Sequence, residues 1–432
     1  SPMRPTPSLW ASMSGPTRLT TLADRALKRA EEAFQNIEEI TEYNQQKVLA
    51  AFIEEKVSEP LFYPTTGYGY GDRGRETLDA LFARIMGTED ALVRHSIVSG
   101  THAITIALFG VLRPGDTLLA ATGAPYDTLE QVIGVKRPSS GSLREYGIAY
   151  REVALQEDGR PDLPAIVQAL EQDPDIRVVH IQRSRGYSLR PSLSVADIGR
   201  IVEAVRSHSS KAVVFVDNCY GEFVEREEPS AAGADLMAGS LIKNPGGGVA
   251  ENGGYICGRA DLVEQCSYRM TTPGLGREVG ASLGHNRSLY MGLFHAPHVV
   301  GEALKTAVFA SALFELLGYE VTPRPLESRT DIIQAVCLHT PEALIAFCQG
   351  MQKGAPVDSF VVPEPWDMPG YDNQVIMADG AFIAGASIEL SADAPLREPY
   401  AAYMQGGLNF SSGKIGVLLA AQSMLEKGLL NL

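Results

Sequence analysis

The order of apolar and polar positions divides the chain into a helical start, an alternating middle and a mixed end. Residues 18–59 carry apolar side chains at helical spacing among good helix formers, which predicts one or two helices. From about residue 90 to 260, short β-branched runs alternate with amphipathic segments. Strands that are followed repeatedly by helices are typical of a mostly parallel sheet with helices on both faces.

The pattern changes again in the last third of the chain. Residues 261–318 are predicted to be helical, and shorter strands follow at DIIQAVCL (331–338), SFVVP (359–363) and AFIAGASIEL (381–390). A last helix is expected from about Ile415. We therefore expect three parts: an N-terminal helical arm (1–60), a large α/β domain (61–300) and a small α+β domain (301–432).

Composition and charge narrow the class of protein. With 432 residues and 45% hydrophobic content, the chain can bury a large core, and more than one domain is expected. It carries 37 basic and 52 acidic residues, a net charge of −15, so nucleic acid and anionic membranes are poor partners. No apolar run is long enough to span a bilayer, and the start does not resemble a signal peptide. A cytoplasmic location is expected.

Several common site motifs are missing or out of context. The five cysteines form no CxxC pair and the eight histidines no HExxH, so the sequence predicts neither a metal site nor a disulfide framework. The phosphate-binding P-loop pattern is absent as well. GASLG (280–284) matches a nucleophile elbow, but no hydrophobic strand precedes it.

The segment VSGTHA (98–103) is a candidate phosphate site. Its small residues end a predicted strand and open a predicted helix, and a helix N-terminus offers unpaired N–H groups and partial positive charge. Gly100 allows close approach of the backbone, and Ser99 and Thr101 add hydroxyl groups. An ordinary strand–helix turn would also accept these residues.

Two further segments end predicted strands. Tyr126 in ATGAPYDTLEQ could stack on a planar ligand, although it could equally be a packed tyrosine. Asp217 in KAVVFVDNCYGEF follows a strand that is apolar on both faces, at the end where open parallel sheets bind ligands. A carboxylate there needs a cation or strong donors, because a buried unpaired charge is costly.

The stretch SLIKNPGGG places Ser240 three residues before Lys243 and glycines just after it. Small neighbours leave room for a bulky planar group, and desolvation or a nearby cation can lower the pKa of such a lysine. Taken alone, Lys243 would be a solvated loop residue. Together, the four segments supply a phosphate seat, a stacking face, a carboxylate for a ring nitrogen and an imine-forming lysine, which is what pyridoxal 5'-phosphate (PLP) requires.

The tracts VSGTHA, IQRSRGYSLRPSL, VDNCYGEF, SLIKNPGGGVAENGGYI and LREPYAAYMQGGL resemble those of fold-type I PLP enzymes. Among these, the chain is similar to the cystathionine β/γ-lyases and methionine γ-lyases, above all to the aluminium-resistance (methionine γ-lyase-like) branch. The resemblance runs from about residue 40 to the end, with Cys219 where Thr or Ser is usual. It implies the fold-type I PLP-dependent transferase fold, a mostly parallel sheet between helices with a smaller C-terminal α+β domain.

The resemblance also implies roles for individual residues. Lys243 would form the Schiff base with PLP and then shuttle the proton from the substrate Cα. Asp217 would keep the pyridine nitrogen protonated, and Tyr126 would stack on the ring. The phosphate would be held by small and hydroxyl residues: Ser99, Gly100, Thr101 and Ser240.

In relatives of this kind, a tyrosine and an arginine of the neighbouring subunit reach the phosphate, and the candidates here are Tyr70 and Arg73. Their spacing departs from the usual Y-x-R. Such sharing implies a homodimer or homotetramer. An arginine normally binds the substrate carboxylate; Arg397 is the first candidate, and Arg183 and Arg185 are its rivals.

The function that the resemblance implies is a PLP-dependent carbon–sulfur lyase, acting by β- or γ-elimination on a sulfur-containing amino acid such as cystathionine, cysteine or methionine. An aminotransferase or a decarboxylase would use the same cofactor, since the outcome depends on which Cα bond breaks. A third reading is a binding or resistance protein with the PLP fold and little lyase activity.

Overall fold

The computed structural model describes residues 17–208, 211–369 and 371–432. Contacts between residues divide the chain into two compact units. The first, here called the sheet unit, contains Ile40–His298 and Arg329–Asp331. The second, here called the terminal unit, contains the described residues from Thr17 to Glu39 together with those of Val299–Ser328 and Ile332–Leu432. The domain boundaries expected at residues 60 and 300 follow element types instead of contacts, and they stay a prediction.

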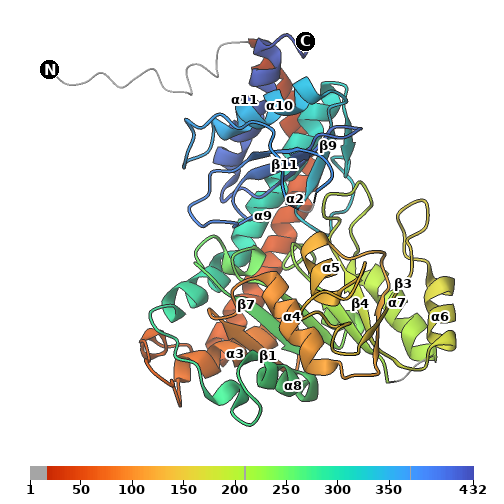
Figure 1. The fold of residues 1–432 in the computed structure, drawn as a ribbon. Helices are drawn as coiled ribbons and strands as arrows, with labels where there is room; N and C mark the ends of the chain where they lie inside the picture. Colours follow the sequence, from red (N-terminus) through yellow and green to blue (C-terminus); the bar gives the residue numbers. More distant parts are fainter. Residues whose placement is uncertain (1–16, 209–210, 370) are drawn as a thin grey trace. The chain divides into compact units, whose positions relative to one another are not determined.

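A mostly parallel sheet forms the centre of the sheet unit (Figure 1). Within the described residues it has seven strands in the order β1-β7-β6-β5-β4-β2-β3. The neighbours from β6 to β3 are parallel, whereas β7 runs antiparallel to β1 and β6. The bounds are β1 (Asp90–Arg94), β2 (Thr117–Ala120), β3 (Ala149–Glu152), β4 (Ile176–Gln182), β5 (Val213–Asp217), β6 (Leu236–Ser240) and β7 (Gly254–Gly258).

Helices cover both faces of this sheet, as the alternating pattern predicts. On one face, Ile104 of a covering helix packs in the same apolar cluster as Ala238 and Ile256 of the strands. On the other face, the ring of Phe82 lies 4.6 Å from that of Tyr255, measured between centroids. The α-helices are α3 (Arg73–Met86), α4 (Gly100–Val111), α5 (Asp127–Ile133), α6 (Leu163–Gln172), α7 (Val195–His208) and α8 (Ala260–Met270). The 3₁₀ turns are η1 (Glu59–Phe62), η2 (Pro229–Ala232), η3 (Asn244–Gly246) and η4 (Gly276–Glu278).

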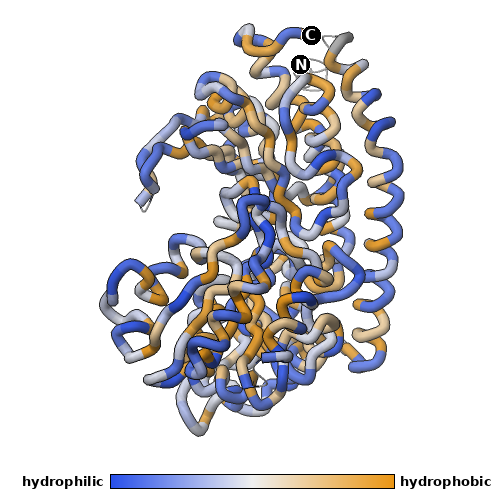
Figure 2. Tube along the Cα trace, turned by 90° about the vertical axis from the view of Figure 1, so that its right-hand side faces the viewer, coloured by the Kyte–Doolittle hydropathy of each residue, from blue (hydrophilic) through white to orange (hydrophobic). Residues whose placement is uncertain are grey.

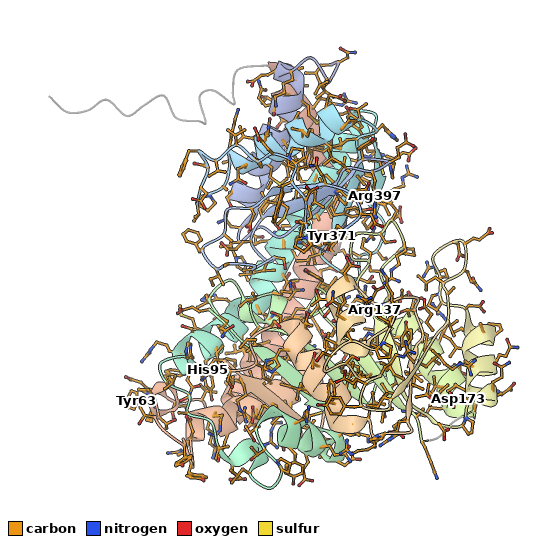
Figure 3. The ribbon with its side chains drawn as sticks, viewed as in Figure 1. Tyr63, His95, Arg137, Asp173, Tyr371 and Arg397 are labelled. Atoms are coloured by element: carbon orange, nitrogen blue, oxygen red, sulfur yellow. The ribbon has the colours of Figure 1, made fainter. Side chains whose placement is uncertain are left out.

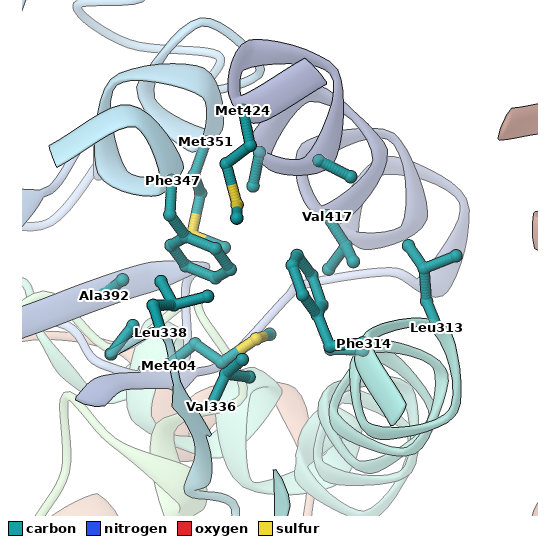
Figure 4. Close-up of a cluster of buried hydrophobic side chains, with 14 of the residues drawn as sticks. Leu313, Phe314, Val336, Leu338, Phe347, Met351, Ala392, Met404, Val417 and Met424 are labelled. Atoms are coloured by element: carbon teal, nitrogen blue, oxygen red, sulfur yellow. The ribbon is translucent and has the colours of Figure 1, made fainter. Parts of the chain in front are cut away.

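The terminal unit is built on an antiparallel sheet. Within the described residues it has five strands in the order β10-β11-β12-β9-β8. Its apolar core joins this sheet to helices, with Phe314, Phe347 and Met404 in one cluster (Figure 4). The elements are β8 (Glu320–Thr322), β9 (Gln334–Cys337), β10 (Val375–Ala378), β11 (Ser391–Pro395), β12 (Ala401–Gln405), α10 (Pro341–Gln352) and α11 (Phe410–Glu426).

Two long helices contribute residues to both units: α2 (Thr17–Glu54) and α9 (Asn286–Leu316). The predicted N-terminal helical region is therefore one helix within the described residues.

Figure 2 shows that hydrophobic positions lie mainly inside the fold. None of the helices in the described ranges is both long and apolar enough to cross a bilayer.

Two expected strands in the last third of the chain are wrong, and the expected last helix is present with an earlier start. Residues 359–363 and 381–390 form no strand, and their aromatic side chains Phe360 and Phe382 are 83% and 68% exposed. An apolar run becomes a strand only where a neighbouring strand and a core receive it. The last helix begins at Phe410, five residues earlier than expected, because Asn409 caps it by accepting a hydrogen bond from the Ser412 N–H at 2.8 Å.

Candidate active site

The carboxyl ends of three neighbouring parallel strands carry polar residues. β4 ends at Gln182, β5 at Asp217 and β6 at Ser240. Gln182 and Asp217 are directly paired across the sheet. Open α/β sheets bind ligands outside this edge, so these residues mark the start of a candidate site.

Lys243 follows β6 by three residues and reaches back toward the end of β5. Its Nζ donates a hydrogen bond to the Tyr220 phenol oxygen at 3.0 Å and lies 4.6 Å from the centroid of the Tyr220 ring. Burial opposes the charged form of Lys243, but the neighbouring Tyr220, Cys219 and Asp217 more than offset this and raise the pKa of the amine. The direction is the reverse of the lowering that desolvation alone would cause.

Asp217 is buried at the end of β5, with 5% of its surface exposed. Its Oδ1 accepts a hydrogen bond from the Cys219 N–H at 3.1 Å. Burial raises the pKa of the Asp217 carboxyl to about 6, although the Cys219 hydrogen bonds and the charge of Lys243 work against this shift. A carboxyl in this position gains from any further cation placed beside it.

The N-terminus of α4 lies against the same residues. Ser99 is the helix cap, and its hydroxyl accepts a hydrogen bond from the His102 N–H at 3.0 Å. A Cβ added at Gly100 would stand 3.1 Å from the Cys219 Sγ and 3.4 Å from the Ser240 Cβ. The structure thus brings the VSGTHA turn, the end of β5 and the SLIK segment together.

Tyr126 completes this group from the turn before α5. Its hydroxyl lies 2.8 Å from the Thr101 Oγ1, and its backbone N–H donates to Gln182 Oε1 at 3.2 Å. Burial, with a smaller contribution from Asp217, raises the pKa of the Tyr126 phenol well above its usual range. The sequence did not single out Gln182; its position at the end of a buried strand was the available signal.

The candidate arginines have different surroundings. Arg183 is 1% exposed, and its guanidinium donates to the Leu193 carbonyl at 3.1 Å and to Asn218 Oδ1 at 2.9 Å. The Arg185 Nε lies 3.8 Å from an oxygen of Asp331.

Arg397 belongs to the terminal unit, where it is exposed on the connection between β11 and β12 (Figure 3). Which of the three arginines binds a substrate carboxylate stays a prediction.

Tyr70 and Arg73 are both exposed, Tyr70 in the loop that precedes α3 and Arg73 as the first residue of that helix. Buried Arg75 anchors this loop: its guanidinium donates hydrogen bonds to the carbonyls of Gly69 at 2.8 Å and Gly280 at 2.6 Å. The pair is thus presented outward on an anchored loop, and its role toward a second copy stays a prediction.

A buried carboxyl lies beside the site and was missed by sequence reasoning. Glu222 accepts a hydrogen bond from the Tyr255 hydroxyl, and its backbone carbonyl accepts one from the Asn244 side chain at 2.9 Å. Burial raises the pKa of Glu222 to about 8. Its place in the GEF segment gave no sign that it is wholly enclosed.

A cavity of about 670 Å³ lies elsewhere in the sheet unit, over α3 and β1. Its lining includes Asp79, which forms ion pairs with Arg94 and Arg277, two further lining residues. None of the residues named above around Lys243 lines it, so the chemistry of the site has to be judged from the carboxyl edge of the sheet.

Comparison with known proteins defines the class first. The pyridoxal-5'-phosphate dependent protein YhfS of Escherichia coli is only 17% identical, but it matches 90% of this chain and 97% of its own with a TM-score of 0.61. The two proteins therefore share a fold. The large, mostly parallel sheet flanked by helices, with a smaller antiparallel sheet, is the fold-type I architecture that the sequence predicts.

Nearer relatives define the family. The methionine gamma-lyase family profile matches residues 19–425. The uncharacterized protein YnbB of Bacillus subtilis is 52% identical over 92% of this chain and 94% of its own. A solved structure from Clostridium novyi NT, described as a carbon-sulfur lyase involved in aluminum resistance, is 51% identical with a TM-score of 0.92, covering 96% of this chain and 97% of its own.

The chain belongs to the methionine gamma-lyase family, which confirms the resemblance seen in the sequence. Enzymes of this family use pyridoxal 5'-phosphate.

Proposed function

We propose that the protein is a PLP-dependent carbon–sulfur lyase that acts on a sulfur-containing amino acid. The observation that carries the proposal is the meeting of Lys243, Asp217 and the N-terminus of α4 at the carboxyl edge of the parallel sheet. The family membership and the carbon–sulfur lyase from Clostridium novyi NT support the same reaction class.

The donor set at this edge fits PLP. Gly100 leaves a space beside Cys219 and Ser240 that a Cβ would crowd. The first N–H groups of a helix have no partner within the helix, so the start of α4 with Thr101 and Ser240 would hold the phosphate. Asp217 is a buried carboxyl that would gain a cationic partner in a protonated ring nitrogen.

When bound, PLP supplies an electrophilic aldehyde and a ring that can take up an electron pair. Lys243 would bind the aldehyde carbon through Nζ and, once free, accept the proton from the substrate Cα at the same atom. Asp217 would hold the proton on the ring nitrogen, and Tyr126 would lie against the ring face. With Lys243 as the base, the sulfur substituent would leave as a thiol, and water would release ammonia and a 2-oxo acid.

Cofactor uptake gives the first test. The purified protein should show the visible colour of bound PLP, and borohydride should fix the cofactor to Lys243 in a form that mass spectrometry detects. Lys243→Ala should lose the fixed adduct and roughly 10²–10⁴-fold or more of the turnover, because it removes both the attachment point and the base. A matched control is Lys211→Ala, which changes an exposed lysine just before β5.

Wild-type protein that stays colourless after PLP is added would contradict the proposal. Products then decide the reaction: thiol and ammonia in equal amounts support the lyase. A 2-oxo acid without ammonia would indicate an aminotransferase, and carbon dioxide would indicate a decarboxylase. Cystathionine, cysteine and methionine are the substrates to compare.

Three finer features belong to the same proposal. Arg397 would bind the substrate carboxylate, with Arg183 and Arg185 as the rivals. Tyr70 and Arg73 would complete the phosphate site of a second copy in a homodimer or homotetramer. The expected cytoplasmic location stays a prediction.

A further inference from the structure

We propose that Tyr220 is a further catalytic residue. When the Lys243 amine is free and protonated, the Tyr220 phenol oxygen accepts a hydrogen bond from it and stabilises the ammonium. The inference rests on the proposed function, since it gives the base a partner. The contact between Lys243 Nζ and the Tyr220 hydroxyl, 3.0 Å long, is the basis. No such role follows from the four segments that the sequence singled out.

Tyr220 meets the lysine with two parts of its side chain. The hydroxyl accepts the hydrogen bond from Nζ, and the ring centroid lies 4.6 Å from the same nitrogen. A hydrogen bond to a charged donor and a cation–π contact both stabilise an ammonium more than a neutral amine. A phenol can also donate to a neutral amine, so it can follow Nζ through both protonation states.

The backbone at Tyr220 is unusual for a tyrosine. Asn218 and Gly221 close a turn with a hydrogen bond of 3.1 Å, and Tyr220 within it has a φ of +71°. Glycine or asparagine is usual where a turn needs a positive φ, and a bulky residue there is strained. Strain that a fold retains tends to lie at functional positions. In this backbone conformation the Tyr220 phenol contacts Lys243.

A buried network holds this turn in place. The Arg183 guanidinium donates to Asn218 Oδ1 at 2.9 Å, and Asn218 Nδ2 donates to Glu228 at 3.0 Å. A Cβ at Gly221 would stand 2.5 Å from an Arg183 nitrogen, so the chain runs directly over the guanidinium. In this structure the Arg183 guanidinium therefore supports the turn that carries Tyr220.

Other titratable groups near Lys243 include Asp217 at the end of β5 and Cys219 just after it, and Tyr126 from the turn before α5 interacts with both. Burial raises the pKa of the Cys219 thiol well above its usual range, so this thiol is a poor competitor for the proton. The Asp217 carboxyl is the group proposed to face a ring nitrogen. The Tyr220 hydroxyl accepts a hydrogen bond from Nζ itself, at 3.0 Å.

The proton transfer is balanced. The Cα–H bond of the substrate breaks, its electron pair stays with the bound substrate, and the proton forms a new bond to Lys243 Nζ. The resulting ammonium donates its hydrogen bond to Tyr220. The same proton can return from Nζ in the reverse direction, so no further reactant is needed.

The protein stripped of PLP provides a direct test through competitive labelling of amines with acetic anhydride, read at the Lys243 peptide by mass spectrometry as a function of pH. Tyr220→Phe keeps the ring and removes the hydrogen bond to the ammonium. We expect its labelling midpoint to fall by about one pH unit below that of wild type. In the PLP-loaded enzyme, kcat should fall about tenfold with little change in KM.

The matched control is Tyr268→Phe, which removes an exposed hydroxyl that hydrogen-bonds Glu264 on α8. Tyr220→Leu removes the ring as well and should shift the midpoint further. The proposal is overturned if Tyr220→Phe labels like wild type, including the case in which only Tyr220→Leu shifts. The labelling experiment needs no cofactor. Failure of PLP uptake would therefore reject the proposed function, whereas the effect of Tyr220 on the Lys243 amine could still be measured.

Discussion

At the scale of single residues, the site combines two kinds of buried titratable group. Burial favours the neutral form of two carboxyl groups, whereas neighbouring groups favour the charged form of one lysine. Asp217 and Glu222 are buried carboxyls, and burial raises the pKa of each, to about 6 and about 8. For Lys243 the neighbours outweigh burial and raise the pKa of the amine. The proposed proton transfer therefore involves Lys243 and the phenol of Tyr220 that hydrogen-bonds it.

Glu222 gives a prediction about stability. A carboxyl with a pKa of about 8 in the folded protein and about 4.3 when unfolded binds more protons in the folded state between these values. Its contribution is fully present below about pH 4.3 and is lost as pH rises toward 8. We expect Glu222→Gln, which stays neutral and can still accept from Tyr255, to gain a few °C in unfolding midpoint relative to wild type between pH 5 and pH 9.

Scanning calorimetry at the two pH values measures this difference. Exposed Glu264→Gln on α8 serves as the control and should keep the same difference from wild type at both. Equal behaviour of Glu222→Gln at pH 5 and pH 9 would mean that Glu222 is not held neutral by burial.

At the scale of elements, the position of α4 decides how closely a ligand can approach. The helix begins at Gly100, and its first turn lies against the residues that end β5 and β6. A side chain at position 100 would contact Cys219 and Ser240. Glycine is therefore favoured here by the space in the site, whereas the helix itself would accept other residues.

We expect Gly100→Ala to weaken PLP binding by about tenfold, since the added methyl would stand only 3.1 Å from the Cys219 Sγ and one of the two has to shift. The dissociation constant can be measured by titration of the bound cofactor's absorbance. Gly284→Ala is the matched control, because a Cβ there meets nothing within 4 Å. Equal affinity of Gly100→Ala and wild type would show that the space is not needed.

Much of the sheet unit could be predicted from the sequence. The alternating pattern predicted a mostly parallel sheet and placed Asp217 at the end of a buried strand, where the structure has it. These features follow from local periodicity, which the amino-acid order records directly.

Other features depend on where distant segments fold and could not be predicted. Residues 359–363 are apolar enough for a strand, but Val362 is 62% exposed because no neighbouring strand pairs with it. Arg183 was a candidate for substrate, and only the fold shows that its guanidinium lies under the Asn218–Gly221 turn. The direction of the Tyr220 side chain depends on a positive φ that no sequence pattern predicts.

At the scale of the whole molecule, sharing of sites between copies can be tested by complementation. Lys243→Ala removes the base, and the double change Tyr70→Phe with Arg73→Ala removes the groups proposed to reach a second copy. Neither protein alone should have full activity, but co-expression should restore a measurable part of it, because a mixed dimer has one complete site. Activity of the mixture no higher than that of its parents would place Tyr70 and Arg73 outside the neighbour's site.

The sheet unit is not a continuous stretch of chain, and this has a consequence for any shortened gene. Arg329–Asp331 are separated from Ile40–His298 in sequence, yet Thr330 hydrogen-bonds Ser192 and Asp331 pairs with Arg185, whose side chain is 2% exposed. A fragment that stopped at residue 298 would leave that guanidinium enclosed without its carboxylate. A shortened gene for the sheet unit should therefore carry Arg329–Asp331 as well as Ile40–His298, so that Ser192 and Arg185 keep these partners.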